Sequence, residues 1–79
     1  MEIVDRLIGL GSPAAALRRA IRLIDEGKAV AAVPLLARAA KAGIAEAEYR
    51  LGRCYLEGMG VPPSRAAAAR WLEIGRAHV

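Results

Sequence analysis

Residues 47–72 read AEYRLGRCYLEGMGVPPSRAAAARWL, and this stretch decides the fold. Residues 45–57 place small and apolar side chains at helical spacing and leave the charged side chains on the remaining arc. The glycines and prolines of residues 58–63 cannot continue a helix and therefore predict a loop. Ser64 is placed to cap a second helix, which ends in a tryptophan–leucine pair. The stretch therefore predicts two helices joined by a glycine- and proline-rich loop.

Several residues of this stretch stand at a spacing typical of one family of helical repeats. They are Ala47, Tyr49, Leu51, Gly52, Tyr55, Gly58, Gly60, Val61, Ser64, Ala68, Trp71 and Leu72. On these residues the chain resembles the Sel-one-like repeat, a relative of the tetratricopeptide repeat. The resemblance implies an all-α fold, a right-handed α/α solenoid of antiparallel helix pairs. It also implies that seven of these residues pack the repeat: Leu51, Gly52, Tyr55, Gly58, Gly60, Trp71 and Leu72.

The first half of the chain predicts a weaker copy of the same unit. Leu36 and Leu72 lie 36 residues apart, within the period of helical-pair solenoids. Residues 13–43 are therefore interpreted as a degenerate first helix pair and residues 45–72 as the repeat itself. Ser12 followed by Pro13 is a strong start signal for the first helix of that pair. Residues 29–42 are apolar nearly all round and are expected to form the most buried helix. Residues 2–9 predict an additional short helix at the start of this single domain.

The last residues are interpreted as a non-native tail. Residues 74–79, IGRAHV, are the translation of a widely used sequencing adapter. The repeat pattern breaks at the same place, because Gly75 and Arg76 stand where the family places two alanines. Residues 73–79 are therefore set aside from the fold, and we expect the natural gene to continue past Leu72.

Composition and charge narrow the class of protein. The chain has 79 residues, a net charge of +4 and one cysteine, so no internal disulfide can form. The uncharged runs are too short to span a bilayer, and the first residues lack a basic signal region. We therefore expect no membrane span and, by default, a cytoplasmic location.

No arrangement of residues indicates catalysis. Cys54 lies on the packing arc of its helix, where a lone cysteine is usually a small apolar filler. Glu46 and Glu48 fall on different helix faces, and His78 belongs to the expected tail. We therefore expect no enzyme activity, catalytic residue, metal, cofactor or small-molecule substrate.

The expected function is a scaffold for protein–protein interaction in a larger complex. The resemblance implies that the first helix of each pair lines a concave groove. The candidate partner-binding residues are Arg18, Arg22, Tyr49, Arg50 and Arg53, and the expected partner is a protein or an acidic peptide. Self-association through the open C-terminal repeat face is also expected. Two alternatives stay open: a small basic nucleic-acid-binding protein, although no recognition helix is evident, and the accessory region of a longer enzyme.

Overall fold

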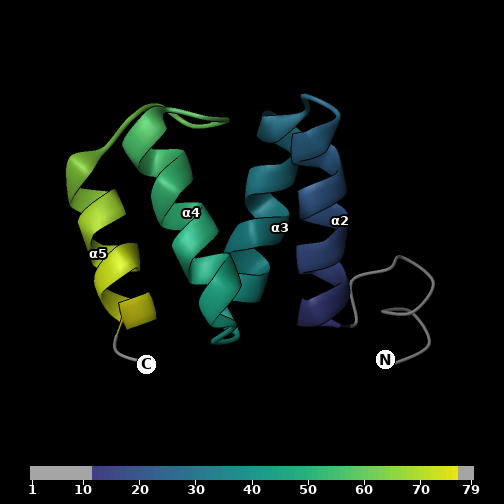
Figure 1. Ribbon diagram of the computed structural model, residues 1–79, viewed down its shortest axis with the longest axis horizontal. Coiled ribbons are helices and arrows are strands. Elements are labelled where there is room, and N and C mark those ends of the chain that lie inside the picture. The colour runs from purple at the N-terminus through teal and green to yellow at the C-terminus, as the bar shows by residue number, and fades with distance from the viewer. Residues whose placement is uncertain (1–11, 77–79) are drawn as a thin grey trace.

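The described part of the chain, residues 12–76, folds into four α-helices that stand side by side in one row (Figure 1). The computed structural model describes residues 12–76, and within this part the chain forms no strand. The helices are α2 (Pro13–Asp25), α3 (Ala29–Lys41), α4 (Ala45–Glu57) and α5 (Arg65–Arg76). The predicted all-α class is therefore confirmed. The short helix predicted for residues 2–9 lies outside the described residues, as do residues 77–79.

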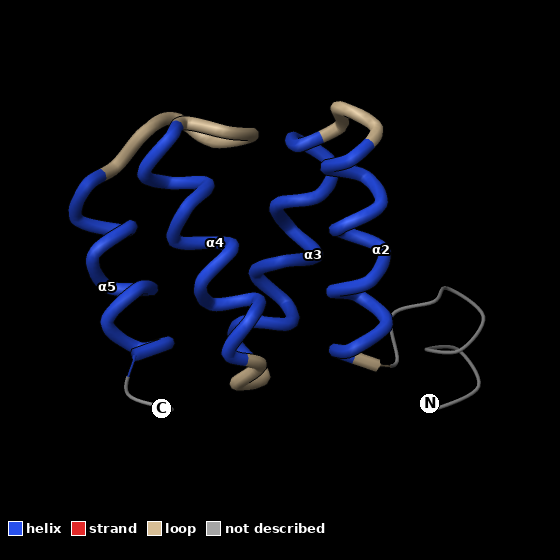
Figure 2. Tube along the Cα trace, in the orientation of Figure 1, coloured by secondary structure: helices blue, strands red, loops and turns tan. Residues whose placement is uncertain are grey.

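Neighbouring helices run antiparallel. The α2–α3 and α4–α5 connections lie along the upper edge of the row in Figure 2, and the α3–α4 connection lies along its lower edge. Each helix packs mainly on its neighbours in the chain, α2 on α3, α3 on α4 and α4 on α5. As a result α3 and α4 each have a neighbour on both sides, whereas α2 and α5 form the two ends of the described row.

The helix boundaries follow from local sequence. The Ser12 hydroxyl accepts a hydrogen bond from the Ala15 amide at 3.2 Å, and Pro13 occupies the first turn of α2. The Ser64 hydroxyl accepts in the same way from the Ala67 amide at 3.1 Å, at the start of α5. Both serines use their side chains to satisfy an amide that the first turn of a helix leaves without a backbone partner, as predicted.

Helix α5 continues beyond the end of the predicted repeat. The repeat pattern ends at Leu72, but the structure keeps residues 73–76 helical. One glycine costs about 1 kcal/mol of helix propensity, and Gly75 stands in the last turn, where this cost is not enough to end the helix. Part of the segment interpreted as a non-native tail is therefore helical here.

The core consists of small side chains from three helices around two leucines. Leu36 of α3 and Leu51 of α4 are fully buried, 0% and 1% exposed. The other members of the buried cluster come from α2, α3 and α4: Leu17, Ala20, Ala32, Val33, Ala39, Ala40, Ala47 and Cys54. Alanines on facing surfaces let the helices approach closely, so truncating either central leucine to alanine should cost about 2–5 kcal/mol. Helix α3, which the sequence predicts to be the most buried helix, buries five residues, and α4 buries the same number.

The loop between α4 and α5 packs on the first turn of α3. Gly58 ends α4 in the left-handed region at φ 71°, and Met59 and Val61 pack against the core. A Cβ placed on Gly60 would lie 2.6 Å from the carbonyl oxygen of Ala29, so the loop backbone touches α3 directly. Glycine is required here by both its φ of +78° and this contact. The loop therefore fastens the second helix pair to the first.

Candidate partner-binding site

The outward face of α4 carries two ion pairs within one helix. The Nε of Arg50 donates to Glu46 Oε2 at 2.9 Å, four residues earlier, as the sequence spacing predicts. The Nε of Arg53 donates to Glu57 Oε2 at 2.9 Å, and its Nη2 donates to the same oxygen. Both arginines of the predicted site on α4 are therefore held by carboxylates of their own helix.

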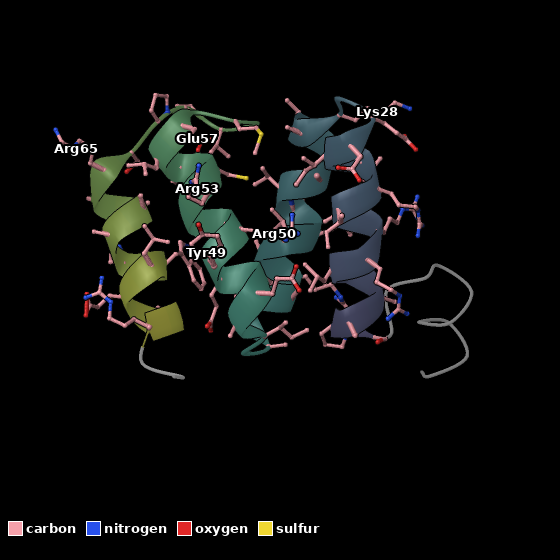
Figure 3. All side chains as sticks on the ribbon, in the orientation of Figure 1. Lys28, Tyr49, Arg50, Arg53, Glu57 and Arg65 are labelled. Atoms are coloured by element: carbon pink, nitrogen blue, oxygen red, sulfur yellow. The ribbon has the colours of Figure 1, made fainter. Side chains whose placement is uncertain are left out.

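Arg53 also holds an aromatic side chain in place. Its Nη1 donates to the hydroxyl of Tyr49 at 3.0 Å, and its guanidinium carbon lies 6.0 Å from the centre of the Tyr49 ring. These contacts raise the pKa of Arg53, mainly through the hydrogen bond to Glu57 and then through the bond to Tyr49. Figure 3 shows Tyr49, Arg53 and Glu57 along one side of α4. The three side chains form a chain of contacts that limits the rotamers of Tyr49.

The predicted arginines of α2 lie on a different part of the surface. Arg18 and Arg22 are exposed on α2, and α3 stands between α2 and α4 in the row (Figure 1). Arg22 and Glu26 are four residues apart, but Glu26 Oε1 lies 3.6 Å from Lys28 Nζ and forms no ion pair with Arg22. A groove shared by the arginines of α2 and α4 stays a prediction.

The exposure of three side chains on α4 differs from the packed arc that the sequence predicts. Tyr49 belongs to that arc but is 52% exposed, and Leu56 is 50% exposed. The charged Glu48 is predicted to lie outside the arc but is buried, with 2% of its surface exposed. Glu48 precedes the buried Leu51 and Gly52 by three and four residues, so helical spacing could have placed it on the same face. The packed face of α4 is therefore rotated toward Glu48, and this rotation exposes Tyr49.

Several residues that are predicted to pack the repeat are buried or half-buried in the structure. Tyr55 and Trp71 lie against the buried cluster, and Leu51 is part of it. Gly52 is buried on α4 and faces Leu72 of α5, and a Cβ added to it would lie 2.8 Å from Leu72 Cγ. Trp71 and Leu72 belong to the C-terminal repeat face that is predicted to be open, but they are half-buried against their own helix pair. Ile74, which is also on α5, is 43% exposed.

A groove opens between α4 and α5 beside Tyr49. It has a volume of about 590 Å³, and its walls are mostly apolar. The lining residues are Ala45, Glu46, Tyr49, Leu72, Gly75 and Arg76. Arg76, which lines the groove, has its Nη1 3.9 Å from Glu73 Oε2. An exposed tyrosine beside a concave apolar surface can receive an apolar side chain of another molecule.

The described residues contain no cluster suited to metal binding. No group of three histidine, cysteine, aspartate or glutamate side chains in residues 12–76 could hold an ion.

Cys54 is a buried free thiol, and its burial raises the pKa of the thiol, with a smaller contribution from the nearby charge of Glu57. A raised pKa lowers the fraction of thiolate, which is the nucleophilic form of cysteine.

Helices α2 to α5 are each 12 or 13 residues long. None of these four helices is long and apolar enough to cross a bilayer.

Comparison with known proteins gives no assignment. No family model matches the chain, and neither a curated protein nor a solved structure is significantly similar to it. The resemblance to the Sel-one-like repeat therefore stays a hypothesis that depends on the residues quoted above.

Proposed function

We propose that this protein is a non-catalytic scaffold of stacked helix pairs that binds another protein. The observation that carries the proposal is the exposed face of α4, where Tyr49 and Leu56 stand half-exposed beside Arg53. Tyrosine and arginine are enriched among the residues that contribute most to protein–protein affinity. Because Tyr49 is already held by Arg53, it loses little conformational freedom when a partner packs on it.

The scaffold is proposed to be a right-handed α/α solenoid of the Sel-one-like type. The row of antiparallel helices supports this, because such repeats stack helix pairs that each contact only their neighbours. The close contact of Gly52 with Leu72 and the glycine loop against α3 also support it. These contacts occur at residues that carry the resemblance.

The proposed partner is an acidic peptide or an acidic protein surface. Arg18 and Arg22 are exposed on α2, and Arg50 and Arg53 lie on the outward face of α4. If these helices line one concave groove, the four guanidinium groups present forked donors to carboxylates of a partner. The arginines of α4 are already paired, so we expect those of α2 to contribute more to the attraction.

An array of peptides with graded acidic content tests this proposal. Two double variants, Arg18→Glu with Arg22→Glu and Arg50→Glu with Arg53→Glu, should bind the acidic peptides more weakly and with a smaller dependence on salt. Arg70→Glu is the matched control, since Arg70 is exposed on α5 and is not among the predicted binding residues. Circular dichroism of each variant establishes that helicity is kept.

Two results would contradict the proposal. If both double variants bind the array as the Arg70→Glu control does, the arginines are merely solvated. If the protein instead binds a DNA duplex with a strong dependence on salt, the nucleic-acid alternative is favoured.

A further inference from the structure

Helix α2 carries a compact cluster of arginines. The members are Arg18, Arg19 and Arg22, and all three are exposed. Arg22 is four residues from Arg18 and three from Arg19, and residues at these spacings are neighbours on a helix surface. Arg22 is therefore a neighbour of both other members. The sequence predicts Arg18 and Arg22 as binding residues, whereas Arg19 is a new member of the set.

The cluster lies mainly on the outer side of α2. Ala20 is fully buried, with 0% of its surface exposed. Arg18 precedes Ala20 by two residues and Arg22 follows it by two, so each arginine stands roughly 160° round the helix from Ala20. Helix α2 is one end of the described row, and its neighbour is α3 (Figure 1). A partner can therefore reach these arginines without entering a groove between α2 and α4.

The charges of this cluster are not balanced within the described residues. The ion pairs of residues 12–76 include none of Arg18, Arg19 and Arg22. Asp25 follows Arg22 by three residues but forms no ion pair with it, whereas both arginines of α4 are held by carboxylates of their own helix. Like charges at these spacings slightly destabilise a helix, so helix stability does not explain the cluster.

A phosphate group fits three neighbouring guanidinium groups better than a carboxylate does. A phosphorylated side chain carries a charge of about −1.5 to −2 at pH 7 and three acceptor oxygens. A carboxylate carries a single charge and two oxygens. Guanidinium groups present forked donors that match both kinds of anion. A phosphate therefore has one oxygen for each arginine of the cluster.

The cluster is too short to follow a nucleic-acid backbone. In α2 it is preceded by uncharged residues, and Asp25 and Glu26 follow it. Proteins that bind nucleic acid neutralise several phosphates, which needs cations along a longer track. The two carboxylates would repel the next phosphates of a strand. The arrangement therefore favours a single phosphate group.

We propose that the cluster of Arg18, Arg19 and Arg22 binds a phosphorylated serine or threonine of a partner protein. The proposal rests on the proposed function, because it names the chemistry of the acidic partner of the same scaffold. It adds Arg19 to the partner-binding residues and places the site on the outer side of α2. Recognition of phosphorylated segments by arginine clusters is a recurring mode of peptide binding.

The test uses the full chain and three labelled peptides of one sequence. Each peptide has two glutamates on either side of a central residue, which is serine, glutamate or phosphoserine. All three peptides are acidic, so the proposed function predicts that all of them bind. Fluorescence anisotropy should also show that the phosphoserine peptide binds roughly tenfold more tightly than the peptide with a central glutamate. Only the inference predicts this difference.

Three variants show whether the cluster is responsible for the difference. Arg19→Glu should weaken binding of the phosphoserine peptide roughly tenfold. Arg22→Lys keeps the charge but removes the fork of donors, so it should reduce the preference for phosphoserine over glutamate roughly threefold. Arg70→Glu, which changes an exposed arginine of α5, is the matched control and should alter binding less than twofold. Circular dichroism establishes that each variant keeps its helicity.

The outcomes separate this inference from the proposed function. Equal binding of the phosphoserine and glutamate peptides would overturn the inference and leave the acidic-peptide scaffold intact. The same conclusion follows if Arg19→Glu binds the phosphoserine peptide as the Arg70→Glu control does. Failure of all three peptides to bind would contradict both proposals. A labelled DNA oligonucleotide that binds more tightly than the phosphoserine peptide would assign the cluster to nucleic acid and overturn the inference.

Discussion

Gly52 of α4 lies directly against Leu72 of α5. A Cβ at position 52 would stand 2.8 Å from both Cγ and Cδ2 of Leu72 and 3.3 Å from its backbone nitrogen. Real Cβ atoms do not approach other atoms to 2.8 Å, so either the leucine or the helix would have to move. The distance between α4 and α5 therefore depends on the absence of a side chain at residue 52.

Gly52→Ala should destabilise the protein by about 1–2 kcal/mol. Overpacking a tight contact costs roughly 1–3 kcal/mol, and the higher helix propensity of alanine returns at most about 1 kcal/mol. Chemical denaturation measures the change in the free energy of unfolding, when the dependence of that free energy on denaturant concentration is the same in both proteins.

Gly75→Ala is the matched control for that substitution. It also lies in a helix, but a Cβ there would meet its nearest neighbour, Glu48 Cβ, at an ordinary 3.7 Å. We expect no loss of stability and a gain of up to about 1 kcal/mol.

When Gly52→Ala and Leu72→Ala are combined, the loss of stability should be smaller than the sum of the two single losses, because alanine at residue 72 removes the clash. Equal stabilisation by both glycine substitutions would show that α4 and α5 are not in close contact.

Gly60→Ala and Gly27→Ala should differ in cost although their backbones are alike. The two glycines have φ of +78° and +79°, so an alanine at either position is strained by about 1–2 kcal/mol. A Cβ on Gly27 would meet nothing within 4 Å, whereas one on Gly60 would meet the carbonyl of Ala29 at 2.6 Å. We expect Gly60→Ala to cost about 3 kcal/mol or more in thermal or chemical unfolding. Equal costs would mean that the loop does not press on α3.

The helices and their ends were predictable because the signals are local. Ser12 and Ser64 act within three residues along the chain, and Gly58 ends its helix through its own backbone conformation. None of these features depends on distant segments. The end of α5 was misjudged, because the repeat pattern stops at Leu72 but nothing in residues 73–76 prevents further helical turns.

The candidate site was predictable only in part, because its exposure depends on how helices pack. The ion pair between Glu46 and Arg50 follows from their spacing of four residues on one helix alone. Helical spacing gives α4 a wide packing arc, but the position of α5 decides which edge of the arc is covered. The contact of Gly52 with Leu72 sets that position, and it buries Glu48 while leaving Tyr49 half-exposed. No local pattern contains that information.

The buried thiol of Cys54 should make stability fall at alkaline pH. Its pKa is raised in the folded protein, mainly by burial, so the folded state holds the thiol proton more tightly than the unfolded state. The resulting stabilisation is complete below the ordinary thiol pKa of about 8.5 and is lost as pH rises above it. Unfolding curves from pH 7 upward should show the decline. Cys54→Ala should decline less, and parallel curves would contradict the raised pKa.

Deletion of residues 74–79 should have little effect on stability. Ile74 is 43% exposed, and Gly75 contributes no side chain to its contact with Glu48. If the deletion exposes the Glu48 carboxylate to water, that exposure carries no desolvation cost. We expect a loss of about 1 kcal/mol or less in thermal unfolding, with nearly unchanged helicity by circular dichroism. A much larger loss would show that this segment belongs to the fold and would weaken its interpretation as an adapter-encoded tail.

The protein should self-associate weakly, and more strongly at high salt. Helix α5 is packed by α4 and ends the described row, with Ile74 exposed on it, and an uncapped repeat end favours association. Association through the end helices brings arginines of two copies together, so salt should screen this repulsion and strengthen the contact. Sedimentation velocity at several protein concentrations, at low and high salt, measures both effects. Ile74→Glu should reduce the association, whereas Arg70→Glu should increase it at low salt by removing a positive charge. A protein that stays monomeric at every concentration and salt would rule out this open-end contact.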